Sequence, residues 1–266
     1  MKRLSGTPGP EIRVIINADD LGHDDGINDA TFRLMEAGKV TSATLMANGD
    51  AIEAAAARVR EFPHCSFGAH LNLTEFHPVT KDPGLDFLLG PDGAFADRRD
   101  ALCRWGLVLD GDRKEALFNE LRAQVDRIRN LGVKISHLDS HNHTHTIGAL
   151  MPVIKRVQRE CGIRRVRVPM NLFDDDRYNA GRSRRLKNRM ISLALRSFPR
   201  AVGPDWFTSF ATFLSPVAQA PVRPGSTVEL MAHPGHPMCD RENALLETDW
   251  ESGLPFTIRR ITYNDI

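Results

Sequence analysis

Short apolar runs alternate with amphipathic stretches along most of this chain. The run at 12–17, IRVIIN, is rich in β-branched residues and ends abruptly in a polar segment, which is the pattern of a buried strand followed by a loop. Residues 26–38 then carry apolar side chains at helical spacing, and Gly38 ends the pattern. Strands that are each followed by a helix indicate an α/β fold with a mostly parallel sheet.

The same alternation continues beyond the first strand and helix. Further strands are predicted at 40–47, 65–71, 133–138, 164–168, 206–213 and 226–232, and further helices at 50–61, 113–131, 148–160 and 181–200. The stretch 72–100 is rich in Pro, Gly and Asp and predicts a long loop, an element that is often functional in compact domains. Because no repeat or linker interrupts the pattern, we expect one domain over 1–266, with the basic amphipathic helix at 181–200 as a candidate insertion.

Polar residues stand where several of the predicted strands end. They are Asp19 and Asp20, His70, Asp139 and His141, and His233. In a parallel α/β fold the carboxyl ends of the strands share one edge, and active sites lie there. We therefore expect four separate segments to bring these side chains to one site. Adjacent carboxylates at a strand end point in different directions, so one can bind a metal while its neighbour faces an attacking water.

The segment 137–145, HLDSHNHTH, is the most specific feature, because it holds four histidines and one aspartate within nine residues. If the chain stays extended, residues at every second position share one face. If it becomes helical after Ser140, His141 and His145 share a face instead. Either geometry presents a metal ligand, but neither makes all of these residues ligands. The others are expected to orient the ligands by hydrogen bonds or to contact substrate.

The residue types in this set suggest metal-assisted hydrolysis. Two histidines and one aspartate leave coordination positions open for water and substrate. Mixed imidazole and carboxylate ligands suit Zn, Fe, Mn or Co, whereas Mg prefers more oxygen ligands. A metal there would lower the pKa of its water toward about 7 and polarise a carbonyl under attack. His233 follows an apolar strand and precedes a Pro-Gly turn, so it is a candidate acid or base.

Composition narrows the class of protein only slightly. The formal net charge is +1, so no global field attracts nucleic acid or a membrane. The four cysteines form no CxxC pair, which favours incidental thiols in a reducing compartment. The first residues contain no apolar signal-peptide core, and no run approaches the roughly 18 apolar residues of a membrane span. We therefore expect a cytoplasmic protein with no membrane span.

Five motifs resemble those of the YdjC/ChbG-type carbohydrate deacetylases, relatives of the hopanoid-biosynthesis deacetylase HpnK. They are NADDLG at 17–22, VTSATLMANG at 40–49, FGAHLNLT at 67–74, HLDSHNHTH at 137–145 and ELMAHPG at 229–235. They occur in the family order. Leu21 stands where the family usually has Phe, and Asn142 replaces the middle residue of a common HHH run, but neither position is an expected ligand.

The resemblance implies a distorted (β/α) barrel similar to polysaccharide deacetylases, and a hydrolase that releases acetate from an N-acetylated sugar such as a chito-oligosaccharide. It also implies a divalent cation, commonly magnesium, held by Asp20, His70 and His141. Asp19 then corresponds to the general base and His233 to the general acid. The residues expected to support the site or contact substrate are Asp139, His143, His145 and Arg167.

Two other functions fit parts of the sequence. A phosphoesterase could use the same metal site, with Arg165, Arg167 and the cations of 181–200 holding an anion. A nucleic-acid-binding module could use the basic helix at 181–200, whose other interpretation is a solvated face covering the barrel. A substrate panel that compares acetate release with phosphate release tests the phosphoesterase. Salt-dependent binding of nucleic acid tests the binding module. The sequence also leaves open whether the chain forms a homo-oligomer.

Overall fold

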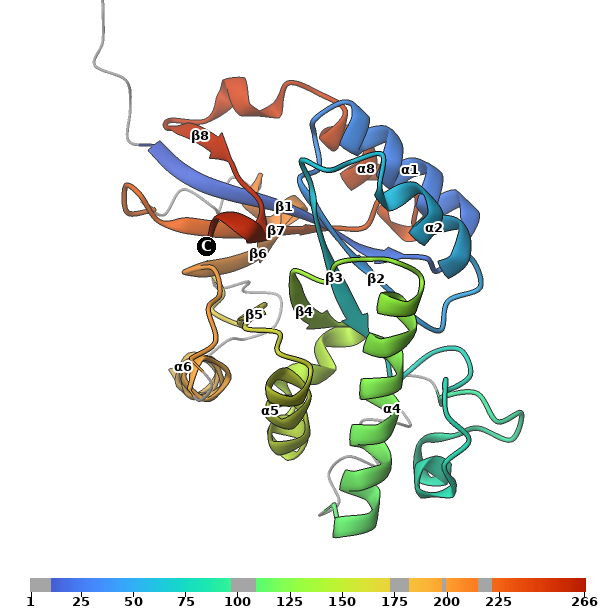
Figure 1. The fold of residues 1–266 in the computed structure, drawn as a ribbon. Helices are drawn as coiled ribbons and strands as arrows, with labels where there is room; N and C mark the ends of the chain where they lie inside the picture. Colours follow the sequence, from blue (N-terminus) through green and yellow to red (C-terminus); the bar gives the residue numbers. More distant parts are fainter. Residues whose placement is uncertain (1–10, 97–108, 173–181, 198–199, 215–221) are drawn as a thin grey trace, which may run out of the picture.

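A parallel sheet lies at the centre of the molecule. The structure is a computed structural model that describes residues 11–96, 109–172, 182–197, 200–214 and 222–266. The strands follow the order β5-β4-β3-β2-β1-β7-β6, and β8 also pairs with β1 (Figure 1). They are β1 (Glu11–Leu21), β2 (Ser42–Leu45), β3 (Ser66–Leu71), β4 (His137–Ser140), β5 (Arg165–Val166), β6 (Trp206–Ser209), β7 (Thr227–Ala232) and β8 (Thr257–Arg260).

The two ends of this strand order meet, so the sheet curls on itself. The segment that follows β5 lies parallel to β6, where Phe207 N donates to Met170 O at 2.8 Å and Leu172 N donates to Phe207 O at 2.9 Å. This contact joins β6 to the opposite end of the order. The predicted α/β fold, a distorted barrel of parallel strands, is therefore confirmed.

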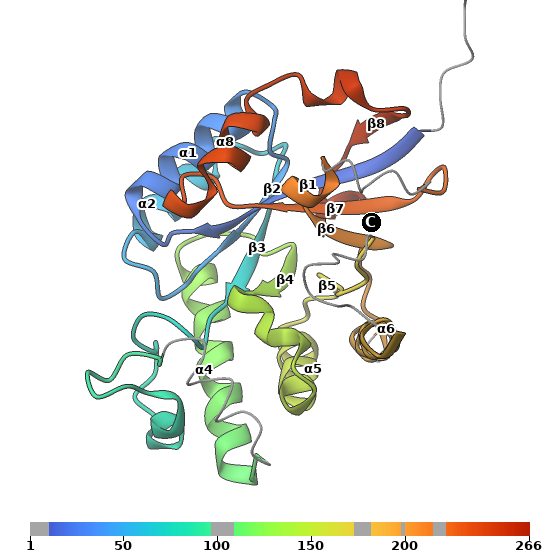
Figure 2. The ribbon, with the colours of Figure 1, turned by 180° about the vertical axis from the view of Figure 1, so that it is seen from behind.

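Helices cover the outside of the curled sheet. They are α1 (Asp25–Glu36), α2 (Ile52–Val59), α4 (Gly111–Asn130), α5 (Met151–Glu160), α6 (Arg182–Arg196), α7 (Phe210–Phe213) and α8 (Asp240–Leu246). Short 3-10 turns include η1 (Pro83–Leu88), η2 (His141–Thr146), η3 (Gly148–Leu150), η6 (Pro237–Cys239), η7 (Trp250–Gly253) and η8 (Tyr263–Asp265). Figures 1 and 2 show α1, α2 and α8 grouped on one side and α4, α5 and α6 on another. Among the described residues, no helix is long and apolar enough to cross a membrane.

The apolar pattern explains why these elements pack as they do. On β1, Val14 and Ile16 point into the main core while Ile15 packs against Tyr263, so both faces of this central strand are buried. The long helix α4 is capped by Asp110, whose side chain accepts a hydrogen bond from Arg113 N, and most of its predicted apolar face is buried. A strand that is buried on both faces is typical of parallel sheets covered by helices.

Several predicted boundaries were wrong for identifiable reasons. β1 does not end before the acidic pair but continues to Leu21, because Leu21 pairs with Leu45 of β2 after a bulge. The strand predicted at 133–138 begins only at His137. The strand predicted at 206–213 stops at Ser209, whose side chain caps α7 by accepting from Thr212 N.

Other elements are absent from the sequence prediction or extend beyond the described residues. Neither α8 nor β8 is predicted by the hydrophobic pattern. The helix predicted at 181–200 corresponds to α6, while residues 181 and 198–199 lie outside the described residues, as do 97–100 of the predicted loop. The single domain over 1–266 and the insertion at 181–200 stay predictions.

Candidate active site

Three of the predicted residues converge at the carboxyl ends of β1, β3 and β4. Asp20 Oδ1 lies 3.1 Å from His70 Nε2 and 2.9 Å from His141 Nδ1. Their donor atoms all lie within 4.8 Å of one another. The side chains of His70 and Asp20 are almost fully buried, and that of His141 is 18% exposed, so the cluster opens toward solvent on the His141 side.

The backbone at Asp20 explains how two adjacent carboxylates serve one site. A regular strand sends successive side chains to opposite faces. Asp20 instead has a φ of 66°, in the left-handed region that costs about 1 kcal/mol for a residue other than glycine. The register between β1 and β2 shifts between Ala18 and Leu21, as in a bulge. This local distortion lets Asp20 reach the histidines while Asp19 stays inside the barrel.

Each histidine of the cluster is held by a second carboxylate. His70 Nδ1 lies 2.7 Å from Asp139 Oδ1, and His141 Nε2 lies 3.1 Å from Glu75 Oε2. Because an ionised carboxylate only accepts hydrogen bonds, Asp139 and Glu75 each keep a proton on the ring nitrogen that faces them, and a metal would replace any proton on the opposite nitrogen. The opposite nitrogen of each ring therefore faces Asp20. Carboxylates that fix the tautomer of a ring in this way are typical of metal-binding histidines.

A second cluster surrounds Arg167, just behind the first. Both Asp19 oxygens accept from its guanidinium at 2.6 and 2.7 Å, which is a bidentate pair. Asp139 Oδ2 lies 2.9 Å from Arg167 Nη1, and Glu229 Oε1 accepts from Arg167 Nε at 2.8 Å. Asp19, His70 and Asp139 also offer donor atoms close enough to hold a metal. The guanidinium already serves as the cation for these two aspartates, so the Asp20 set is the better metal candidate.

The buried charges shift several pKa values. Burial alone would raise the pKa of Asp19, but the charge and hydrogen bonds of Arg167 hold it well below its usual value. Burial raises the pKa of Glu229 to about 7, although Arg167 opposes this shift. Burial lowers the pKa of His70, but the charge of Asp139 and the hydrogen bonds that the ring donates to Asp139 and Asp20 overcome it and raise the value to about 10. Negative charge thus exceeds positive charge around the ring of His70.

His233 lies directly after β7, next to Glu242 of α8. Its backbone N donates to Glu242 Oε1 at 2.7 Å, and its Nδ1 lies 3.6 Å from the same oxygen. Burial lowers the pKa of this imidazole, but hydrogen bonds with Cys239 and Glu242 and the charges of the two site aspartates raise it well above its usual value. The ring is therefore a protonated group close to the carboxylates.

The loop after β4 adopts neither of the two geometries that the sequence left open. Its chain turns sharply at Asn142 and His143, whose φ values are 53° and 55°. His145 Nδ1 lies 2.5 Å from Ser140 Oγ, and the ring of His143 is nearly perpendicular to that of Phe207, with the ring centroids 5.5 Å apart. Burial lowers the pKa of both imidazoles, so they are neutral. These contacts make His143 and His145 supports of the loop, outside the three-residue cluster.

Comparison with known proteins places the chain in a family. A family model described as "YdjC-like protein" matches residues 13–257. The chain belongs to the YdjC-like family. This YdjC-like protein is 31% identical to a carbohydrate deacetylase of Brevibacillus brevis over 85% of its own length and 82% of the relative. It is also 31% identical to a carbohydrate deacetylase of Geobacillus stearothermophilus, over 84% of its length and 79% of the relative.

A solved structure has the same fold. A putative cellobiose-phosphate cleavage protein from Enterococcus faecalis superposes on this YdjC-like protein with a TM-score of 0.73 at 20% identity, covering 95% of this chain and 98% of that one. At this identity the likeness concerns the fold alone.

The fold of this YdjC-like protein brings to the site several residues that the sequence pattern does not predict. Glu75 contacts His141, and its Oε1 also lies 3.3 Å from His23 Nε2. Thr44 Oγ1 donates to Asp139 Oδ2 at 3.0 Å. Glu229 was overlooked too, although a carboxylate in the middle of the apolar strand TVELMA is a usable signal, because an unpaired charge is rarely buried.

Proposed function

We propose that this protein is a metal-dependent hydrolase that removes the N-acetyl group from a small acetylated amino sugar and releases acetate. The observation that carries the proposal is the convergence of Asp20, His70 and His141 beside the Asp19–Arg167 pair. The relatives named carbohydrate deacetylases support the reaction and the class of substrate. A chito-oligosaccharide is the first substrate to test.

The residues of the Asp20 cluster fit a divalent cation. One carboxylate and two imidazoles present donors within 4.8 Å of one another, and each imidazole is oriented by a further carboxylate. Three protein ligands leave coordination positions open for water and substrate. Two imidazoles in the set favour Zn, Mn or Co over the magnesium that the resemblance implies.

The proposed mechanism is hydrolysis of an amide. A divalent cation at this site supplies Lewis-acid polarisation of the acetyl carbonyl and makes a water molecule more acidic. Asp19, kept ionised by Arg167, accepts a proton from the attacking water as the new C–O bond forms. His233, kept protonated by its neighbours, gives a proton to the departing nitrogen as the C–N bond breaks. The products are acetate and a free amino sugar.

Acetate release tests the proposal directly. We expect the protein to release acetate from N,N′-diacetylchitobiose or from another member of a panel of N-acetyl sugars. EDTA should abolish the release, and added Mg, Mn, Co or Zn should restore it. His141→Ala should lower both bound metal and acetate release by roughly 100-fold or more, because it removes one ligand of three.

The matched control is His64→Ala, since His64 is exposed and its ring centroid lies 6.2 Å from that of Phe62. This variant should keep its metal and its activity. Full activity of His141→Ala would contradict the assignment of the ligands. Metal-dependent phosphate release from sugar phosphates, without acetate release from any sugar, would replace the deacetylase with a phosphoesterase.

A further inference from the structure

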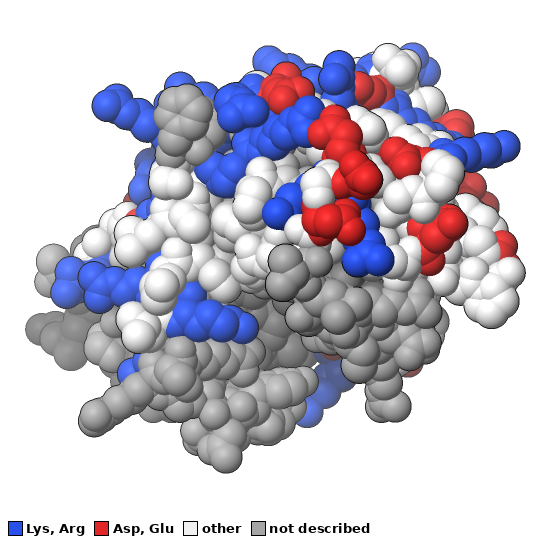
Figure 3. Space-filling view, turned by 90° about the horizontal axis from the view of Figure 1, so that it is seen from below, with Lys and Arg blue, Asp and Glu red and all other residues white. Residues whose placement is uncertain are grey.

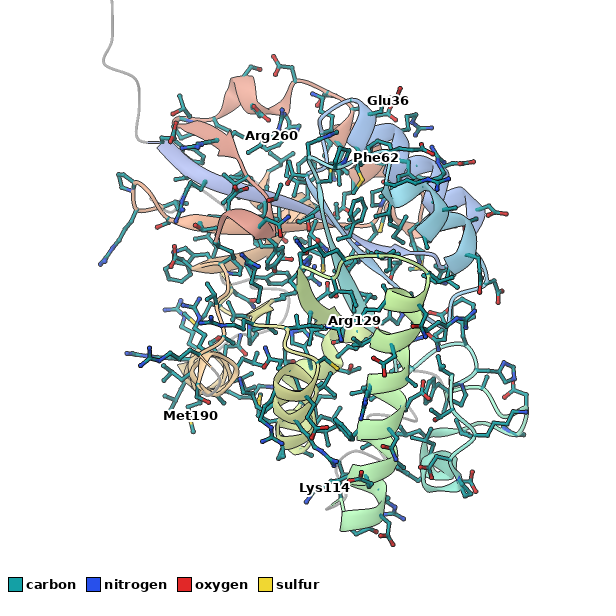
Figure 4. The ribbon with its side chains drawn as sticks, viewed as in Figure 1. Glu36, Phe62, Lys114, Arg129, Met190 and Arg260 are labelled. Carbon is teal, nitrogen blue, oxygen red and sulfur yellow. The ribbon has the colours of Figure 1, made fainter. Side chains whose placement is uncertain are left out.

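Helix α6 carries an apolar stripe on its outer side. Leu186 is 60% exposed, and Met190 and Leu193 are each 63% exposed. Spacings of four and three residues place these side chains on one face of the helix. Figure 4 shows Met190 on the side of α6 that points away from the sheet.

The opposite face of α6 is already used for packing. Ser192 and Leu195 are buried, and α6 contacts α5. Lys155 of α5 donates to Leu195 O at 2.7 Å, which ties the end of α6 to the body of the protein. The helix therefore has two apolar faces, and only one of them is satisfied by the fold.

Exposed apolar side chains of this size are concentrated on α6. Among the described residues, the large hydrophobic side chains that are exposed are Leu186, Met190, Leu193, Val202 and Met238, so three of the five belong to this one stripe. Single exposed apolar residues are ordinary on a protein surface, but a contiguous group indicates a binding surface.

Positive charge borders the stripe. The helix sequence RSRRLKNRMISLALR contains no acidic residue. With about 100° between successive residues, Lys187 and Arg189 fall on opposite sides of the stripe, and both are exposed. In Figure 1, α6 lies at the lower left, and in Figure 3, seen from below, Lys and Arg gather on the left part of that face while most of the carboxylates lie on the right.

We propose that α6 docks this protein on the surface of a membrane that contains anionic lipids. The helix lies flat on the bilayer, its apolar stripe enters the boundary between headgroups and acyl chains, and its cations contact the lipid phosphates. This function goes beyond the hydrolysis of a sugar amide and uses none of the residues of the candidate active site.

Two other occupants fit the helix less well. In a symmetric contact with a second copy, α6 would meet the same cations on its partner, and like charges repel. A nucleic acid would pair with the cations, but it would leave the apolar stripe in water. An anionic bilayer satisfies both features of the surface.

Vesicle co-sedimentation of the full chain tests the proposal. One set of vesicles is pure phosphatidylcholine, and the other also contains about 30% phosphatidylglycerol, at about 0.1 M salt. We expect binding at least about ten-fold stronger to the anionic vesicles. The triple variant Leu186→Gln, Met190→Gln, Leu193→Gln should lose this binding by about ten-fold or more. Met238→Gln, which changes an equally apolar exposed residue outside α6, should bind like the parent protein.

Several outcomes would overturn the proposal. They are equal binding to both kinds of vesicle, no binding to either, and full binding by the triple variant with an unchanged circular dichroism spectrum. Salt-dependent binding of an oligonucleotide without vesicle binding would assign α6 to nucleic acid. A concentration-dependent dimer that disappears in the triple variant, again without vesicle binding, would assign it to a second copy. Acetate release from a soluble sugar should be unchanged in the triple variant, which separates this test from that of the proposed function.

Discussion

Glu75 shows how one side chain tunes the candidate metal site from outside the ligand set. It contacts His141 on one side and His23 on the other. The hydrogen bond from His141, followed by the one from His23, lowers the pKa of Glu75 to about 2 in spite of the partial burial of this carboxylate. Glu75 is therefore ionised at neutral pH and fixes the ring of His141 so that Nδ1 faces Asp20.

We predict that Glu75→Gln weakens metal binding by about 10- to 100-fold, because the amide orients the ring less strongly and makes it a weaker ligand. Calorimetric titration of the metal-free protein with Mn or Zn measures this affinity. Glu61→Gln is the matched control. Glu61 is exposed, and its ion pair is weak, since its Oε2 lies as far as 3.9 Å from Arg58 Nε. An unchanged metal affinity together with a raised KM would instead make Glu75 a substrate contact.

At the scale of elements, helix α4 holds the loop that carries Glu75. The buried carboxylate of Glu120 accepts hydrogen bonds from Val79 N, Thr80 N and Thr80 Oγ1 at 2.7 to 2.9 Å. One turn later, Gln124 donates to Asn72 O and accepts from Asn72 N. Two side chains of one helix thus fix both ends of the segment that follows β3.

Removal of the Glu120 carboxylate should loosen this attachment. Glu120→Ala leaves several backbone and hydroxyl donors without a partner, so we predict a loss of about 3 kcal/mol in the free energy of unfolding. Urea denaturation measures the loss. Asp126→Ala on the same helix serves as the control and should change stability by less than about 0.5 kcal/mol, because Asp126 is in an exposed ion pair. A loss below about 1 kcal/mol for Glu120→Ala would show that water replaces the carboxylate.

At the scale of the whole molecule, the curled sheet encloses a charged centre. Arg167 is 1% exposed and contacts carboxylates from β1, β4 and β7. One guanidinium faces three carboxylates, and Glu229 in addition accepts a hydrogen bond from Tyr263 at 2.6 Å. Burial with this excess of negative charge is why the pKa of Glu229 rises to about 7.

This raised pKa predicts a dependence of stability on pH. The folded protein holds the Glu229 proton more tightly than the unfolded chain, whose value is 4.5, so the contribution is fully present below pH 4.5 and is lost as the pH rises through 7. Relative to Glu229→Gln, which cannot titrate, the free energy of unfolding should fall by about 3 kcal/mol between these limits. Urea unfolding of both proteins at pH 5, 6, 7 and 8 measures the difference. A difference that is constant with pH would contradict the prediction.

The sequence by itself determined the order of strands and helices and the place of the site. Hydrophobic periodicity is a local property, so it predicted β3, α4 and β7 within a few residues. Because the carboxyl ends of parallel strands share one edge, the sequence also predicted that the polar residues at those ends, among them Asp20, His70 and His141, would meet there.

The tertiary structure alone decided which contacts form between segments that are distant in the chain. Glu75 joins the site because α4 holds its loop, and the bulge at Asp20 arises from pairing with β2. The sequence of α6 likewise contains two apolar faces, and the apolar pattern cannot distinguish the face that packs on α5 from the face that stays exposed. Local periodicity records which side chains are apolar, but only packing against other elements decides which of them are buried.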